Sequence, residues 1–151
     1  MHSYKILEHT ADVRLYVEGS SMEDIFTAAI EGMAEIIKKN ACKVFAAKAA
    51  SAVKKAQTSN AGIKKEIKVS SANPTLLLID FLSEVLTLSQ IEKIVFCAAK
   101  FGEPAGKKVS AIIYGRKVKS FDEDIKAVTY HEAEIKKNKS GNLETIIIFD
   151  I

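Results

Sequence analysis

Alternating apolar and polar positions along the chain predict a series of short β-strands. Runs rich in β-branched and aromatic residues, bounded by turn-forming residues, are typical of strands. The last four runs form two successive pairs, each around a turn-rich segment, and are predicted to be antiparallel hairpins. The runs occupy residues 4–8, 13–17, 63–69, 93–101, 109–118, 125–135 and 143–151.

Two helices are predicted between these strands. Apolar residues recur at three- and four-residue spacing over 22–37, directly after Ser21, which together with Asp24 has the spacing of a capping box. A second, mostly apolar helix is predicted at 75–88, because the Asn-Pro pair before it combines a preferred N-cap with a preferred first helical residue. The order β, β, α, β, α, β, β, β, β indicates an α+β fold of mostly antiparallel sheets with two helices.

Length and composition indicate a single globular domain spanning residues 1–151. A core of this size needs no metal or disulfide, so a bound metal would be functional. No apolar run approaches the ~20 residues of a membrane helix, and the N-terminus lacks the pattern of a signal peptide. The two cysteines, Cys42 and Cys97, form no CxxC pair. These features predict a reduced, cytoplasmic protein without membrane association.

Positive charge is concentrated in one segment. The whole chain has 22 basic and 19 acidic residues, a net charge of +3, whereas residues 43–68 contain seven Lys and one Glu. An Ala- and Lys-rich insertion is predicted at about residues 43–62. Such a segment either attracts phosphates or an acidic protein surface, or is simply solvated.

Carboxylates near the two ends of the chain are the best candidates for chemistry. The apolar run IIIFDI predicts a strand buried on both faces, which would hold Asp150 beside the carboxylate of Ile151. Like charges this close repel each other unless a cation or a basic group compensates. Asp12, between two predicted strands, is the third carboxylate that we expect there, and an oxygen cluster of this kind suits Ca²⁺ or Mg²⁺. Taken alone, an Asp in a turn is more often a local cap or an Asx-turn, and Asp150 alone is similarly ambiguous.

Other chemical groups have weaker support. Lys126 could contact a phosphate or the carboxylates, or could be an ordinary lysine at a strand edge. His9 and His131 lack the spacing of a zinc site, and Cys97 lies in an apolar strand where thiols are usually inert. No GxGxxG, GxxxxGK[ST], GxSxG or HExxH motif occurs in the sequence.

Four segments together resemble the archease family of proteins associated with tRNA splicing. They are HTADVRLYVEGSSMEDIFTAAIEGM at 9–33, LLLIDFLSEVL at 76–86, IKAVTYH at 125–131 and the final FDI. Two features depart from the family pattern: the basic insertion is longer than usual, and Ser83 replaces the usual Asn or Asp. The resemblance implies two interleaved strand-helix-strand-strand units, the second nested at about 62–119.

The resemblance also implies a function. Members of this family are accessory proteins, not enzymes, of the RtcB-type RNA ligase. They promote guanylylation of the ligase and thus its multiple turnover, and tRNA is involved only through the ligase. A divalent metal, Ca²⁺ in the family and with Mg²⁺ or Mn²⁺ as alternatives, is expected at Asp12, Asp150 and Ile151. Lys126 matches a functionally important lysine that would contact the partner or its nucleotide. Further candidates in the matched motifs are His9, Thr10 and His131.

Two other function classes remain open from the sequence. A metal-dependent phosphoesterase or nuclease would use the same carboxylates to activate water. An RNA-binding module would instead use residues 43–68 together with Lys107, Lys108, Lys117 and Lys119, and its affinity would fall steeply with salt.

Overall fold

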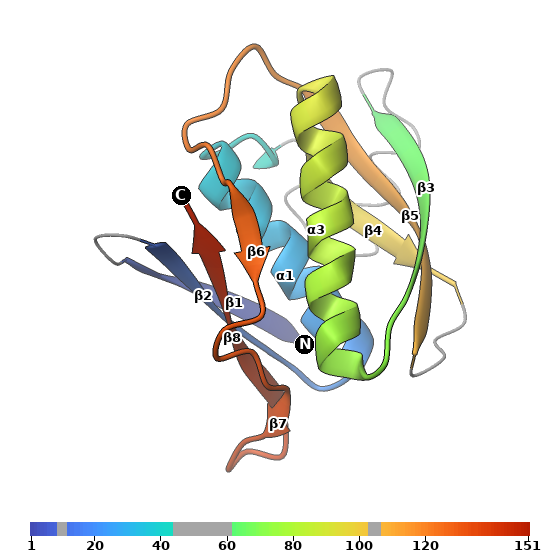
Figure 1. Ribbon diagram of the computed structural model, residues 1–151, viewed down its shortest axis with the longest axis vertical. Coiled ribbons are helices and arrows are strands. Elements are labelled where there is room, and N and C mark those ends of the chain that lie inside the picture. Colours follow the sequence, from blue (N-terminus) through green and yellow to red (C-terminus); the bar gives the residue numbers. More distant parts are fainter. Residues whose placement is uncertain (9–11, 44–61, 103–106) are drawn as a thin grey trace.

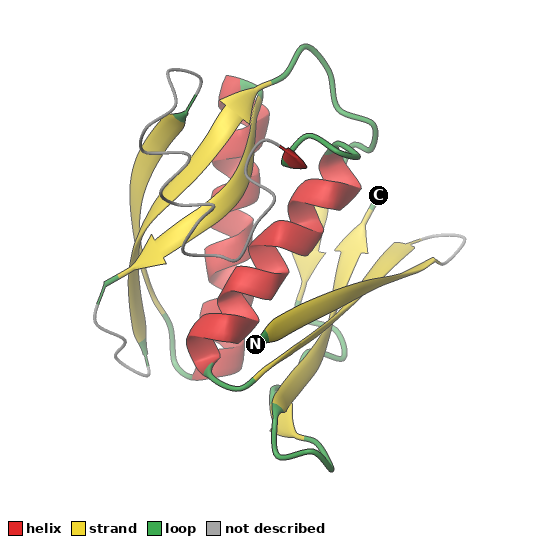
Figure 2. Ribbon diagram, turned by 180° about the vertical axis from the view of Figure 1, so that it is seen from behind, coloured by secondary structure: helices red, strands yellow, loops and turns green. Residues whose placement is uncertain are grey.

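Two antiparallel sheets flank two helices in the computed structural model, which describes residues 1–8, 12–43, 62–102 and 107–151 (Figures 1 and 2). The predicted α+β class is confirmed. The larger sheet has the order β1-β2-β8-β6, with β7 also paired to β8, and the smaller has the order β3-β5-β4. The strands are β1 (His2–Glu8), β2 (Asp12–Gly19), β3 (Ile63–Ser70), β4 (Ile94–Phe101), β5 (Lys108–Lys117), β6 (Ala127–Thr129), β7 (Lys136–Lys137) and β8 (Leu143–Asp150).

The smaller sheet comes from one continuous part of the chain. Residues 63–117 provide β3, then the helix α3 (Pro74–Glu92), and then β4 and β5. This segment separates β1 and β2 from β6 and β8 in the sequence, although all four strands belong to the larger sheet. The larger sheet therefore joins residues from the two ends of the chain.

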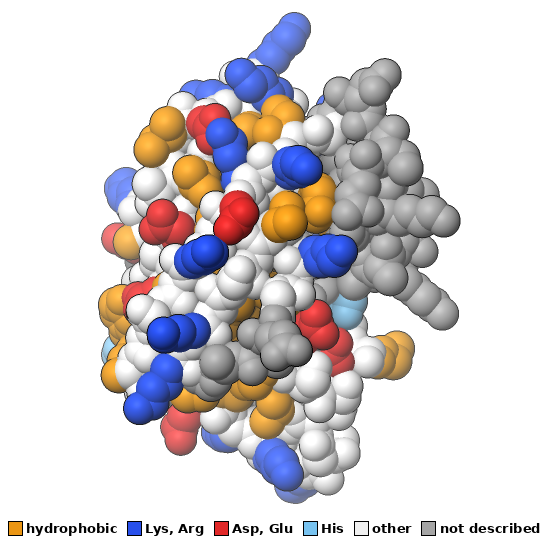
Figure 3. All heavy atoms as spheres, turned by 90° about the vertical axis from the view of Figure 1, so that its right-hand side faces the viewer, with side chains coloured by type: hydrophobic (Ala, Val, Ile, Leu, Met, Phe, Trp, Pro, Cys, Tyr) orange, Lys and Arg blue, Asp and Glu red, His pale blue; other side chains and the backbone are white. Residues whose placement is uncertain are grey.

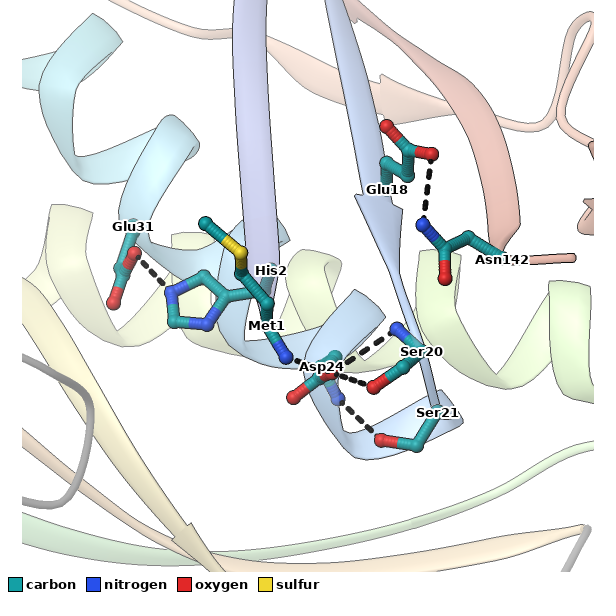
Figure 4. A network of polar contacts seen from close by, with 8 residues as sticks. All are labelled: Met1, His2, Glu18, Ser20, Ser21, Asp24, Glu31 and Asn142. Carbon is teal, nitrogen blue, oxygen red and sulfur yellow. Dashed lines mark hydrogen bonds and ion pairs between the residues drawn. The ribbon is translucent and has the colours of Figure 1, made fainter. Parts of the chain in front are cut away.

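Polar caps begin both helices where the sequence predicts them. Helix α1 (Met22–Ile37) starts after Ser21, whose Oγ accepts a hydrogen bond from the Asp24 backbone N–H at 3.1 Å (Figure 4). The Asp24 carboxylate does not complete the capping box on Ser21; it accepts hydrogen bonds from the Ser20 N–H and hydroxyl instead. At the start of α3, the Asn73 side chain accepts a hydrogen bond from the Leu76 N–H at 3.0 Å.

Both helices contact both sheets, so the core lies between them. At its centre, Phe26 of α1, Phe81 of α3 and Phe101 of β4 pack with ring centroids 5.3 to 5.9 Å apart. Gly32 of α1 lies directly against the buried Leu15 of β2: a Cβ at this glycine would be 2.6 Å from a Leu15 methyl carbon. Helix α1 can therefore approach the sheet closely only because this position has no side chain.

Helix α3 differs from one prediction, which concerned the length of apolar segments. It has 19 residues, an 18-residue window of it has a mean hydropathy of 1.3, and by length and composition alone it could cross a membrane. The prediction that no apolar run approaches this length is therefore wrong. The same apolar character serves the core, because most of its large side chains are buried between the sheets. They are Leu77, Leu78, Ile79, Phe81, Leu82, Val85 and Leu86.

The prediction of one continuous strand over residues 125–135 is also wrong in part. Only Ala127–Thr129 and Lys136–Lys137 form strands. Between them the chain turns, with the Ala133 N–H bonded to the Tyr130 carbonyl and Glu132 at φ 60°, in the left-handed region. The apolar spacing of this segment continues through the turn, which explains why the pattern suggested a continuous strand.

The two cysteines form a disulfide, contrary to the prediction of reduced thiols. Cys42 follows α1 and Cys97 lies in β4, where the register shifts between Phe96 and Ala98; their Cα atoms are 5.5 Å apart. The partners are separated by 55 residues in the sequence, so spacing could not reveal the pair. Most of the predicted insertion at 43–62 lies outside the described residues.

Candidate acidic site at the end of the five-stranded sheet

Asp12 and Asp150 are direct neighbours across two strands. Asp12 begins β2, Asp150 ends β8, and the antiparallel register places them opposite each other. Opposed residues on paired strands project to the same face, with Cβ atoms typically about 5 Å apart. Asp150 is exposed and Asp12 is half-buried. The fold thus brings together two carboxylates that are 138 positions apart in the sequence.

Lys126 lies beside this pair. Its backbone N–H donates a hydrogen bond to the Asp150 carbonyl at 2.7 Å, and the next residue, Ala127, is the register partner of Asp150 in β6. The Lys126 side chain is exposed. Figure 1 shows the end of β8 next to the start of β6. Strands β2, β8 and β6 therefore have adjacent ends, where the backbone of Lys126 is bonded to the residue that carries the second carboxylate. We call Asp12, Lys126 and Asp150 the acidic site.

Sequence reasoning missed an ion pair that borders the acidic site. Arg14 lies two residues after Asp12 in β2, on the same face of the sheet, and forms an ion pair with Glu132 at 2.8 Å. Glu132 belongs to the turn after β6. No spacing in the sequence could have shown this contact, because it depends on β6 and β2 both lying next to β8.

The other residues named from the sequence have no recorded contact with the acidic site or cannot be placed. His131 is exposed in the turn after β6, and its backbone N–H donates to the Thr129 hydroxyl at 3.3 Å. His9 and Thr10 lie outside the described residues. Cys97 is bonded to Cys42, so it offers no free thiol.

A second polar cluster, also missed, connects α3 with the loop after β6. The hydroxyls of Ser71 and Tyr130 both donate hydrogen bonds to the Asp80 carboxylate. The hydrogen bond to Asp80 raises the pKa of the Tyr130 phenol, with burial and the Asp80 charge adding to the effect. This cluster fixes the loop that carries Glu132 against α3.

The donor atoms of the acidic site suit a hard divalent cation. Carboxylate and carbonyl oxygens are the ligands that Ca²⁺ and Mg²⁺ prefer. Asp12 and Asp150 supply the carboxylates, and the main chain at Ile151 can supply a further oxygen. In the described part of the chain, no group of three His, Cys, Asp or Glu side chains is placed to hold a metal. A cation here would therefore depend on main-chain oxygens and water for the rest of its coordination.

Comparison with known proteins identifies the family of this chain. The sequence profile of the Archease protein family matches residues 4–151, nearly the whole chain. The chain belongs to the archease family. Among its archease relatives is that of Methanosarcina barkeri, 30% identical, with 96% of this chain and 94% of the relative covered. The archease of Pyrococcus abyssi is 28% identical over the full length of both chains.

Solved structures support the archease fold. The solution structure of a Methanobacterium thermoautotrophicum protein matches with a TM-score of 0.70 at 23% identity, covering 98% of each chain. A crystal structure described as an archease and possible chaperone, from Thermotoga maritima, matches with a TM-score of 0.61 at 20% identity, covering 97% of this chain and 96% of that chain. At these identities the likeness concerns the fold.

Proposed function

We propose that this protein is an accessory factor of an RtcB-type RNA ligase in tRNA splicing, where it promotes guanylylation of the ligase and so allows multiple turnover. The proposal starts from membership of the archease family. The observation that carries it is the register pairing of Asp12 with Asp150, with Lys126 bonded to the same strand end. Such a site can act on a partner's nucleotide without a nucleophile of its own.

Each residue of the acidic site has a role in this proposal. Asp12, Asp150 and a main-chain oxygen of Ile151 hold a divalent cation, Ca²⁺ first, with Mg²⁺ and Mn²⁺ as alternatives. The cation supplies positive charge that offsets the two carboxylates and attracts phosphate oxygens. Lys126, exposed beside them, contacts the ligase or its nucleotide.

Action as an accessory factor distinguishes this proposal from an enzymatic one. A metal-dependent phosphoesterase would use the same carboxylates to activate water, and the purified protein alone with Mg²⁺ or Mn²⁺ would then hydrolyse RNA or phosphoesters. We expect no such turnover.

The proposed site of action is the cytoplasm, where tRNA is processed. The disulfide between Cys42 and Cys97 opposes it, since most cytosols keep thiols reduced. Intracellular proteins of hyperthermophiles are an exception and are often rich in disulfides. Thiol titration of the protein isolated without reductant would decide whether the bond exists in the cell.

Ligation under limiting enzyme tests the proposal. The ligase from the same organism is assayed with and without this protein, and joined RNA is counted per ligase molecule. We expect several turnovers with the wild-type protein and about one without it. Asp12→Asn and Asp150→Asn should remove the stimulation, whereas the control Glu84→Gln, at an exposed position of α3, should retain it.

Two results would contradict the proposal. One is the same number of turnovers with and without the protein. The other is full stimulation by both aspartate variants, which would show that the acidic site plays no part.

A further inference from the structure

The three-stranded sheet has one face against the helices, and part of its other face is exposed. Its inner face carries apolar residues such as Ile67, Ala111 and Ile113, which are buried in the core. Strand residues alternate between faces, so the residues between them point outward. On β3 these are mostly charged: Lys64, Glu66 and Lys68, all exposed.

Lysines from all three strands share this outer face. Cross-strand register puts Lys68 opposite Ser110, and Lys100 on the same row as Glu66 through Ile112. The one acidic side chain of the set, Glu66, is 3.6 Å from Lys68. Figure 3, which views this side of the molecule, shows Lys and Arg side chains spread over it with acidic and hydrophobic ones between. The exposed lysines of this basic face are Lys64, Lys68, Lys100 and Lys108.

The structure separates these lysines from others in the same basic segment of the sequence. Lys65 lies on the inner side of β3 and forms an ion pair with Glu92 of α3 at 2.9 Å. Lys100, outside that segment, joins the basic face from β4. With four lysines and one glutamate, the basic face has a net charge of +3, counted as 4 minus 1.

We infer that the basic face binds the sugar-phosphate backbone of RNA. Single positive charges spread over an extended surface are what phosphate contacts require. A shallow hollow of about 250 Å³ among Glu66, Lys100 and Ser110 gives the backbone a place to lie. This inference does not depend on the proposed action on the ligase.

A nucleic acid fits this face better than a protein partner does. Protein interfaces are organised around buried apolar or aromatic anchors. In the described part of the chain, the exposed large hydrophobic side chains are Met1, Ile91 and Tyr130, and none belongs to the three-stranded sheet. Tyr114, the aromatic residue on this face, is only 3% exposed and cannot stack a base. Binding should therefore be insensitive to base sequence.

Charge-driven binding has a measurable salt dependence. If the four lysines each neutralise one phosphate, log K should fall with log[salt] at a slope of about −2.8 on a single strand, since each contact contributes about −0.7. Raising the salt from 50 to 200 mM should then weaken binding about 50-fold.

Fluorescence anisotropy with the full chain and no ligase tests the inference. The probe is a fluorescein-labelled single-stranded RNA of 20 nucleotides and mixed sequence. Removing the four positive charges should abolish the salt-dependent binding, while replacing the same residues by Arg should preserve it. The charge-removing variant carries Lys64→Gln, Lys68→Gln, Lys100→Gln and Lys108→Gln.

A matched control loses the same net charge elsewhere. It replaces four exposed lysines outside the three-stranded sheet and should bind the RNA within about twofold of wild type. Glu66→Gln should strengthen binding, because it removes the one negative charge from the basic face. The control variant carries Lys5→Gln, Lys136→Gln, Lys137→Gln and Lys139→Gln.

Several results would overturn the inference. These are no RNA binding by the wild type at 50 mM salt, equal weakening by the two fourfold Gln variants, or unchanged binding by the charge-removing variant. Loss of ligase stimulation with intact RNA binding in that variant would instead assign the basic face to a protein partner. Far-UV circular dichroism checks that each variant is folded. If the charge-removing variant is unfolded, the Arg variant provides the test: loss of RNA binding in a folded Arg variant would overturn the inference.

Discussion

Removing the disulfide should destabilise the protein by an amount that the chain topology sets. The bond joins residues separated by 55 positions. Closing a loop of that length lowers the entropy of the unfolded chain by about 14 cal/mol/K, or about 4 kcal/mol at 25 °C. The test variant is Cys42→Ser/Cys97→Ala, because Cys42 is half-exposed and Cys97, at 3% exposure, needs a small apolar replacement.

Urea denaturation followed by far-UV circular dichroism measures this effect, since the chain has no Trp for fluorescence. With an m-value of about 2 kcal/mol/M, the midpoint of the variant should fall by about 2 M urea. Wild-type protein in excess dithiothreitol should show a similar shift, and the variant should not respond to the reductant. Equal midpoints for oxidised and reduced wild type, or two titratable thiols in the unfolded oxidised protein, would refute the reasoning.

Three further predictions concern α1 and α3. Gly32→Ala should lower the free energy of unfolding by about 1 kcal/mol, because overpacking against Leu15 outweighs the gain in helix propensity; a raised melting temperature would contradict this. Asn73→Ala should cost about 1 kcal/mol by removing the N-cap of α3, and unchanged urea unfolding would show that the cap contributes nothing. Burial raises the pKa of Asp24, but hydrogen bonds from Ser20 and the N-terminal ammonium outweigh it and leave that pKa below its ordinary value. The folded state therefore favours the ionised form, so Asp24→Asn should lower the melting temperature at pH 7, and the difference should vanish as the pH falls below about 4. A pH-independent difference would contradict this last assignment.

Local patterns predicted the helices and most strands because their causes are local. Ser21 and Asn73 cap the helices within three residues of their bonding partners, and the apolar run of β8 reflects the burial of consecutive residues in this strand. The strand expected at 125–135 failed because apolar spacing cannot show that Glu132 adopts a left-handed turn conformation. The length of α3 was underestimated because polar residues at its C-terminal end interrupt the apolar run without ending the helix.

Long-range pairing was harder to predict. Chemistry and the family resemblance suggested that Asp12 and Asp150 belong together, and the β2-β8 register now gives the geometric reason. The Arg14–Glu132 ion pair and the disulfide left no trace in the sequence, because each depends on how separate elements pack.

The positions of the lysines in the basic segment (residues 43–68) were also hard to predict. Its lysines looked equivalent by composition, yet Lys64 faces outward while Lys65 is paired with Glu92 on the inner side of the sheet. One position along a strand reverses the face on which a side chain lies. The sequence therefore predicts which segment of the chain carries the positive charge, but not on which surface of the fold each lysine lies.

The most direct test of the central claim is the transfer of guanylyl groups to the ligase. With radiolabelled GTP and an RNA substrate in excess, the number of groups transferred per ligase molecule is counted over the whole reaction. The account predicts several transfers per ligase with the wild-type protein, and about one without it or with Asp12→Asn/Asp150→Asn. An equal count in all three reactions would contradict it.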